Sequence, residues 1–260
     1  MMKHLPAILI LLSTLLTLPA CAEDLYDRIP KVGTAYSDRY RYKMTVEVET
    51  PEGVKSGSAV REIYARDSTN QLIGGVRGVC ANNAKGEAVV VDLGKRGVLF
   101  VLLTQGGGST DHMWQVVHAT FPRDGILGGS CLEEGIKYYA SLKAEGDVPL
   151  KAMPMMVTFA DMDDPTSVQY VYGAESYQEP LPHGGSKRAW RLKEDNFEKL
   201  FGRGVKLHRV KLEMADEPVT EEVGEWLSWL NKLQGNYLHN GLTARGAPLG
   251  LHAGSFKKGE

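Results

Sequence analysis

Cysteine is scarce in this chain of 260 residues, which contains only Cys21, Cys80 and Cys131. The chain is long enough to bury a hydrophobic core without a dense set of disulfide staples. A strong charge of one sign is also lacking, since 30 lysines and arginines stand against 32 aspartates and glutamates, a net charge of −2. This even mixture argues against a nucleic-acid partner and leaves no polybasic patch for an anionic lipid surface.

The sequence also lacks the short motifs that identify common enzymes. It has no Gly-x-Ser-x-Gly nucleophile elbow, and its nearest approach is Ser130 after two glycines, which we interpret as a loop before a helix that begins near Leu132. The glycines at 74–78 and 106–108 lack the Walker lysine and the dinucleotide fingerprint, and turns account for them. We therefore expect no catalytic motif and no cofactor.

Metal ligands are present in only loose groupings. Asp111, His112 and His118 have the chemistry of a zinc site, but a spacing of six places the two histidines on one face of a strand and not of a helix. Asp161 to Pro165 lacks the glycine and distal glutamate of an EF-hand loop, so it is expected to cap a turn. We expect surface or loop histidines and no metal site.

Only one long hydrophobic run is present, and it lies at the N-terminus. Lys3 provides a positive start, residues 5–18 are largely apolar, and the small residues Ala20 and Ala22 follow. These are the three zones of a secretory signal, whereas a spanning helix needs about 20 apolar residues. The pattern predicts an exported, periplasmic protein with a signal peptide at residues 1–22.

Two ways of processing this signal remain open. Cleavage after Ala22 would release a soluble chain that begins at Glu23, and this is the form we favour. Leu18 to Cys21 alternatively resembles a lipobox, in which Cys21 becomes lipidated and anchors the protein to the envelope. Contact with the membrane is therefore expected only if Cys21 carries a lipid.

Either cleavage leaves two cysteines, Cys80 and Cys131, in an oxidising compartment. An even number of cysteines there suggests a disulfide bond between them. Such a bridge would close a loop of about 50 residues, for which chain entropy gives on the order of 4 kcal/mol of stabilisation. The alternative is two buried thiols that never meet.

Alternation of apolar and polar residues predicts several strands. Tyr42, Met44, Val46 and Val48 would share the buried face of a strand over 40–50, which turns at Pro51–Gly53 into a returning strand. Gly57 in that strand predicts a bulge or a close approach of another backbone. Further strands are expected at 86–93, 98–103, 153–160 and 205–214, of which the first two are apolar on both faces, as in the middle of a layered structure.

Helical patterns are shorter and fewer. We expect helices over 132–144 and 193–201, and one that begins with Thr220 as its N-cap, while 113–121 is ambiguous between helix and strand. Because strands adjoin in sequence instead of alternating with helices, the predicted fold is α+β: mainly antiparallel sheet built from sequential hairpins, with a few short helices. Residues 23–260 are expected to form a single domain with an irregular C-terminal tail.

Three segments, 41–58, 86–103 and 205–220, resemble a group of exported bacterial proteins to which no activity is assigned. The resemblance implies export and one continuous fold across most of the mature length. It carries no catalytic residue to this chain.

These features favour a non-enzymatic envelope protein that binds an unknown envelope protein partner through a sheet surface. The alternative is a periplasmic hydrolase whose residues meet only in three dimensions, for which His112, His118 and Ser130 are the candidates. Trp226 and Trp229 could form an exposed stripe for a partner, although docking of their helix on the sheet is the preferred interpretation.

Overall fold

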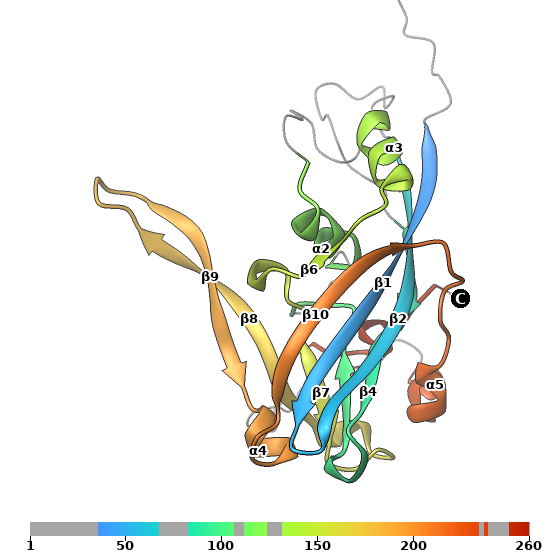
Figure 1. Cartoon of the computed structure of the whole chain (residues 1–260), viewed down its shortest axis with the longest axis vertical. Coiled ribbons are helices and arrows are strands. Elements are labelled where there is room, and N and C mark those ends of the chain that lie inside the picture. The colour runs from blue at the N-terminus through green and yellow to red at the C-terminus, as the bar shows by residue number, and fades with distance from the viewer. Residues whose placement is uncertain are drawn as a thin grey trace, which may run out of the picture.

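The computed structural model describes residues 36–67, 83–106, 112–123, 132–233, 237–238 and 250–259. Two antiparallel sheets lie face to face, with four short α-helices around them, so the fold is α+β as predicted (Figure 1). Cys21, Cys80 and Cys131 lie outside the described residues, as does the whole signal segment. Their disulfide bond, lipidation and cleavage therefore stay predictions.

One sheet has six strands in the order β11-β3-β2-β1-β10-β6. Its strand β1 alternates strictly: Tyr42, Met44, Val46 and Val48 are fully buried, as the pattern predicted, while the opposite face carries charged side chains. One solvated face is usual for an antiparallel sheet. The strands are β1 (Ser37–Thr50), β2 (Gly53–Arg66), β3 (Asn83–Glu87), β6 (Glu145–Asp147), β10 (Lys206–Ala215) and β11 (Lys257–Lys258).

Three strands of the second sheet, β4, β5 and β7, are largely buried on both faces, as expected for β4 and β5 from their apolar sequences, whereas β9 is exposed. Leu99 and Val101 face the six-stranded sheet, whereas Phe100 and Val157 pack with Phe256 from the C-terminal segment. The predicted irregular tail thus contains a buried anchor and β11. The sheet order is β4-β5-β7-β8-β9, with β4 (Val89–Asp92), β5 (Val98–Val101), β7 (Met156–Phe159), β8 (Val168–Pro180) and β9 (Ser186–Asp195).

The chain passes from one sheet to the other at Ala88, between β3 and β4. The fully buried Arg61 stabilises this corner, because its guanidinium donates to the carbonyl oxygens of Glu87 (3.0 Å) and Val101 (3.2 Å). Gly57 of β2 lies directly against the backbone of Val90. The predicted close approach is therefore confirmed, and β1 and β2 pair through Gly57 without a bulge.

The helices are shorter than their patterns suggested. The ambiguous segment forms α2 (His112–Thr120), and the predicted helix near 132 forms α3 (Glu133–Ser141). The helix expected at 193–201 begins late, as α4 (Phe197–Phe201), because residues 193–195 belong to β9. The N-cap prediction for Thr220 is wrong, since its hydroxyl accepts the Val60 N–H and the four-residue α5 (Val223–Trp226) starts later. Single 3-10 turns occur at Gly94–Arg96, Leu150–Ala152, Pro165–Ser167, Leu230–Lys232 and Ala253–Ser255.

A feature absent from the sequence predictions is a long arm. Strands β8 and β9 continue beyond the sheet as a two-stranded ribbon that projects from the body (Figure 1). A register shift between Gly173 and Ala174 marks where this β8–β9 arm leaves the sheet.

Candidate functional site

A pocket lies where β10 ends and β1 continues alone. β1 pairs with β2 along its whole length, from Ser37 to Thr50, but it pairs with β10 only from Arg41 onward. Within the described part of the chain, Ser37 to Tyr40 therefore have a strand neighbour on one side only. The chain leaves β10 at Asp216 and opens a gap between β1 and the end of α3.

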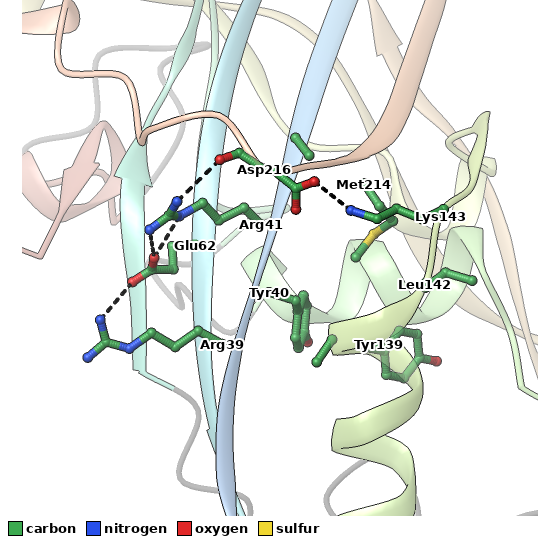
Figure 2. A pocket seen from close by; sticks show the side chains of 11 residues that line it. Arg39, Tyr40, Arg41, Glu62, Tyr139, Leu142, Lys143, Met214 and Asp216 are labelled. Carbon is green, nitrogen blue, oxygen red and sulfur yellow. Dashed lines mark hydrogen bonds and ion pairs between the residues drawn. The ribbon is translucent and has the colours of Figure 1, made fainter.

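This pocket has a volume of about 240 Å³, and four segments far apart in sequence line it (Figure 2). β1 and β2 form one wall of the pocket. The end of α3 with the residues after it forms a second wall, and the end of β10 forms a third. The lining residues are Arg39, Tyr40, Arg41, Glu62, Tyr139, Ala140, Leu142, Lys143, Met214, Ala215 and Asp216.

Two tyrosine rings form the floor of the pocket. The rings of Tyr40 and Tyr139 are 5.8 Å apart and both are nearly buried. The Tyr139 hydroxyl donates to the carbonyl oxygen of Phe121 at 3.1 Å, and the Tyr40 hydroxyl lies 3.3 Å from Nε2 of His118. His118 stacks on Tyr139 with 4.3 Å between ring centroids. These contacts fix the floor rigidly.

Burial keeps the groups of the floor uncharged at neutral pH. It raises the pKa of Tyr139 to about 12 and raises the pKa of Tyr40 even further above its ordinary value. Burial also lowers the pKa of His118 to about 4. None of the three changes protonation near pH 7, whereas a general acid or base works best with a pKa close to the operating pH.

The rim, in contrast, is charged. Glu62 lies between two arginines, at 2.7 Å from Arg41 and 3.6 Å from Arg39, and its side chain is largely buried. On the other side Lys143 pairs with Asp216 at 2.6 Å (Figure 2). The lining thus holds three cationic side chains and two anionic ones, so one positive charge lacks an acidic counterpart within it.

The backbone of β1 also faces the pocket. The carbonyl oxygen of Tyr36 accepts the N–H of Asp67, beyond the end of β2. Because successive residues of a strand direct their peptide groups to opposite sides, those of Arg39 point toward the position that β10 has left. The carboxylate of Asp38 accepts the Arg39 N–H at 2.7 Å. An edge of backbone, an aromatic floor and a charged rim therefore meet at one place.

The structure separates the two histidines that sequence analysis grouped. His118 lies under the pocket, whereas His112 is buried at the start of α2 with Nε2 lacking a hydrogen-bond partner. Burial, together with the positive charge of Arg61, lowers the pKa of His112 to about 3. Asp111 and Ser130 lie outside the described residues. No group of three potential metal ligands occurs in the described ranges.

The remaining predicted positions have structural roles. Asp164 caps the 3-10 turn at 165–167 by accepting the Thr166 N–H at 2.8 Å, which confirms the capping interpretation of this acidic segment. Trp226 and Trp229 do not form one stripe, because Trp226 is 37% exposed while Trp229 is 7% exposed. Trp229 packs beneath the five-stranded sheet and donates its indole N–H to Met162.

Sequence reasoning did not find the pocket residues. The strand expected over 40–50 included Tyr40 and Arg41, but its pattern did not reveal where β10 would end. Tyr139 lay within the helix expected over 132–144, and that pattern did not assign it to a site.

Comparisons of the chain with protein-family models, with curated proteins and with solved structures found no match. The resemblance to exported bacterial proteins therefore stays a prediction. Among the described residues, no helix combines the length and the hydrophobicity needed to cross a bilayer.

Proposed function

We propose that this chain is an exported, periplasmic binding protein without enzymatic activity, and that the pocket beside β1 receives its ligand. The observation that carries the proposal is the half-paired end of β1, whose backbone edge faces the pocket. A strand edge next to a cavity offers main-chain hydrogen bonds to an extended chain, as in recognition by strand addition.

The lining favours a peptide segment that carries a carboxylate. Its backbone would donate to the carbonyl oxygen of Arg39, whose own N–H bonds to Asp38, in the position that β10 occupies farther along the strand. A carboxylate on the segment would lie near the ends of Arg39 and Lys143, whose side chains are 65% and 67% exposed. An apolar side chain would rest on the rings of Tyr40 and Tyr139. The expected partner is thus an envelope protein with an extended, acidic segment.

The hydrolase alternative has no observation of its own in the described residues. His118 is the titratable group closest to the pocket floor, but its pKa of about 4 makes it a poor base near neutral pH. The geometry supports binding better than catalysis.

Site-specific photocrosslinking in cells tests the proposal. A photoreactive amino acid replaces Lys143 at the rim, and a matched one replaces Lys199, an exposed residue of α4 at the opposite end of the molecule (Figure 1). A third variant adds Ala140→Phe, which fills the pocket from α3. We expect one discrete protein adduct from position 143, none of the same mass from position 199, and loss of the adduct on filling.

Identical adducts from both positions, or an adduct at position 143 that survives filling of the pocket, would contradict the proposal. Mass spectrometry of the adduct would identify the crosslinked segment and test whether it is extended and acidic.

A further inference from the structure

Strand β9 forms one edge of the five-stranded sheet and is ten residues long. All of its residues are exposed or only partly buried, and most of the strand belongs to the projecting arm (Figure 1). The strands at the other ends of the two sheets, β4, β6 and β11, have only four, three and two residues. Because the free peptide groups of an edge pair with other strands, proteins normally shorten or cover it. β9 is neither short nor covered.

The backbone of β9 is oriented for further pairing. At the tip of the arm Leu181 donates its N–H to the carbonyl oxygen of Gly185, which makes these two residues a hydrogen-bonded pair. Counting along the register from there, the odd-numbered residues of β9 before the register shift bond toward β8. The peptide groups of Arg188, Trp190 and Leu192 consequently point away from β8, to the open side.

The free edge is basic. From Ser186 to Lys193, four of the eight residues are lysine or arginine and none is acidic. Two of these cations pair with glutamates of β8, whereas Arg188 and Lys193 have no acidic partner among the described residues. Glu194 and Asp195 follow only at the base of the arm, where they accept hydrogen bonds from the two residues after the strand. The exposed length of β9 therefore carries positive charge that the arm does not neutralise.

This charge pattern selects against a second copy of β9. An antiparallel copy about a two-fold axis at Trp190 would set Lys187 against Lys193, and a parallel copy in register would set each cation against itself. Like charges directly opposite each other destabilise a strand pair, whereas opposite charges stabilise it. Charges on an edge strand thus protect it from its own kind. They do not protect it from an acidic strand, which they attract.

The two faces of β9 differ in chemistry. Lys187 and Arg191 lie on one face, together with the glutamates that they pair with. Trp190 and Leu192 lie on the other face, where Trp190 packs against the hydrophobic cluster between the sheets and Leu192 is 42% exposed. A strand added beside β9 would place alternate side chains next to the two cations and the side chains between them next to Trp190 and Leu192. Acidic residues suit the first set and apolar residues suit the second.

We propose that the free edge of β9 binds, by strand addition, an extended segment of another protein in which acidic residues alternate with apolar ones. The added strand turns the arm from a two-stranded ribbon, which is marginally stable in water, into a three-stranded sheet. No residue of β9 lines the pocket beside β1, so this is a second binding surface that does not depend on the first.

A peptide titration tests this surface in protein purified from cells that express the full chain. The probe is the acetylated peptide Thr-Val-Glu-Val-Glu-Val-Glu-Thr, and the control peptide has glutamine in place of each glutamate. Binding is followed by NMR through the amide signals of Arg188, Trp190 and Leu192. Arg188→Pro removes an outward N–H, which an edge strand tolerates. Arg188→Thr is its matched control, because it removes the same charge but keeps the N–H, and circular dichroism checks that both variants are folded.

We expect the acidic peptide to bind about ten times more tightly than the glutamine peptide, because each opposite-charge pair across the strands adds to the affinity. Arg188→Thr should weaken binding about threefold through the lost charge, and Arg188→Pro should abolish it.

Equal affinity for the two peptides, no binding of either, or equal effects of the two variants would overturn the proposal. Signals of the arm that shift with vesicles of phosphatidylglycerol but not with the peptide would overturn it in favour of a lipid surface. Shifts confined to the β1 edge beside the pocket would also overturn it, while leaving the proposed function in place.

Discussion

Gly57 on β2 lies so close to β4 that no side chain fits between them. A Cβ at this position would be 1.8 Å from the carbonyl oxygen of Val90, which is backbone and cannot rotate away. We expect Gly57→Ala to lower the free energy of unfolding by about 3 kcal/mol, because the two sheets must separate locally. Urea denaturation measures the loss.

Gly224 in α5 is the matched control, since a Cβ there meets nothing within 4 Å. Gly224→Ala should change stability by no more than about 1 kcal/mol and should tend to increase it. Equal urea midpoints for the two variants would show that the sheets are not packed as described.

The two buried histidines make stability depend on pH. Burial lowers the pKa of His118 to about 4 and of His112 to about 3, whereas a histidine in the unfolded chain has a pKa of about 6.5. Below pH 6.5 the unfolded chain therefore binds protons before the folded one does. The free energy of unfolding is expected to fall as the pH drops from 6.5 to 4, by up to about 1.4 kcal/mol per pH unit for each histidine.

His118→Phe isolates one of these contributions, because phenylalanine can keep the stack on Tyr139 but cannot take up a proton. We expect the pH profile of its unfolding free energy to be flatter than that of the unmodified protein between pH 6.5 and 4. Parallel profiles would mean that His118 is protonated equally in both states.

Among the elements, the β8–β9 arm contributes least to the folded body. Its outer half, from Gln178 to Arg188, contains no buried side chain. Replacing residues 178–188 by Asn-Gly, which forms a tight hairpin turn, should connect Tyr177 to Ala189 in their existing register. We expect the melting temperature to change by less than about 3 °C, since the core is untouched. A much larger decrease, measured by calorimetry, would assign the arm a structural role.

The elements also show what local sequence could predict. β1 and β2 were identified correctly because Tyr42, Met44, Val46 and Val48 alternate with polar residues over a whole strand. The arm was missed because charged side chains pair across the ribbon, Glu179 with Lys187 and Glu175 with Arg191, so its strands lack the apolar face by which a strand is usually identified. The helix predicted from Thr220 failed because Thr220 bonds to Val60, 160 residues away.

The candidate site was beyond prediction for a related reason. Arg41 and Asp216 meet although 175 residues separate them. The pocket exists because β10 pairs with β1 only from Arg41 onward, which leaves the first four residues of β1 without a strand on that side. A register of this kind depends on long-range pairing, and no local pattern encodes it.

At the scale of the whole molecule, the five-stranded sheet belongs to two hydrophobic clusters at once. Met44 lies in the cluster between the sheets, and Phe256 lies in the cluster beneath the five-stranded sheet. We expect Met44→Ala and Phe256→Ala each to cost about 3 kcal/mol or more, and each to shift a single cooperative transition. Fluorescence and circular dichroism followed together in urea test this, and separate transitions for the two clusters would contradict it.

The register shift at the base of the β8–β9 arm acts as a hinge. On one side β8 is buried between two layers at Val171, and beyond Ala174 the residues of the arm are exposed or only partly buried. The length from Glu175 to Pro180 is a lever of roughly 16 Å, at about 3.3 Å per residue. A rotation of a few degrees at Gly173 moves the tip by ångströms while the clamped sheet stays still. The β8–β9 arm can thus change its direction while the packing of the two sheets stays the same.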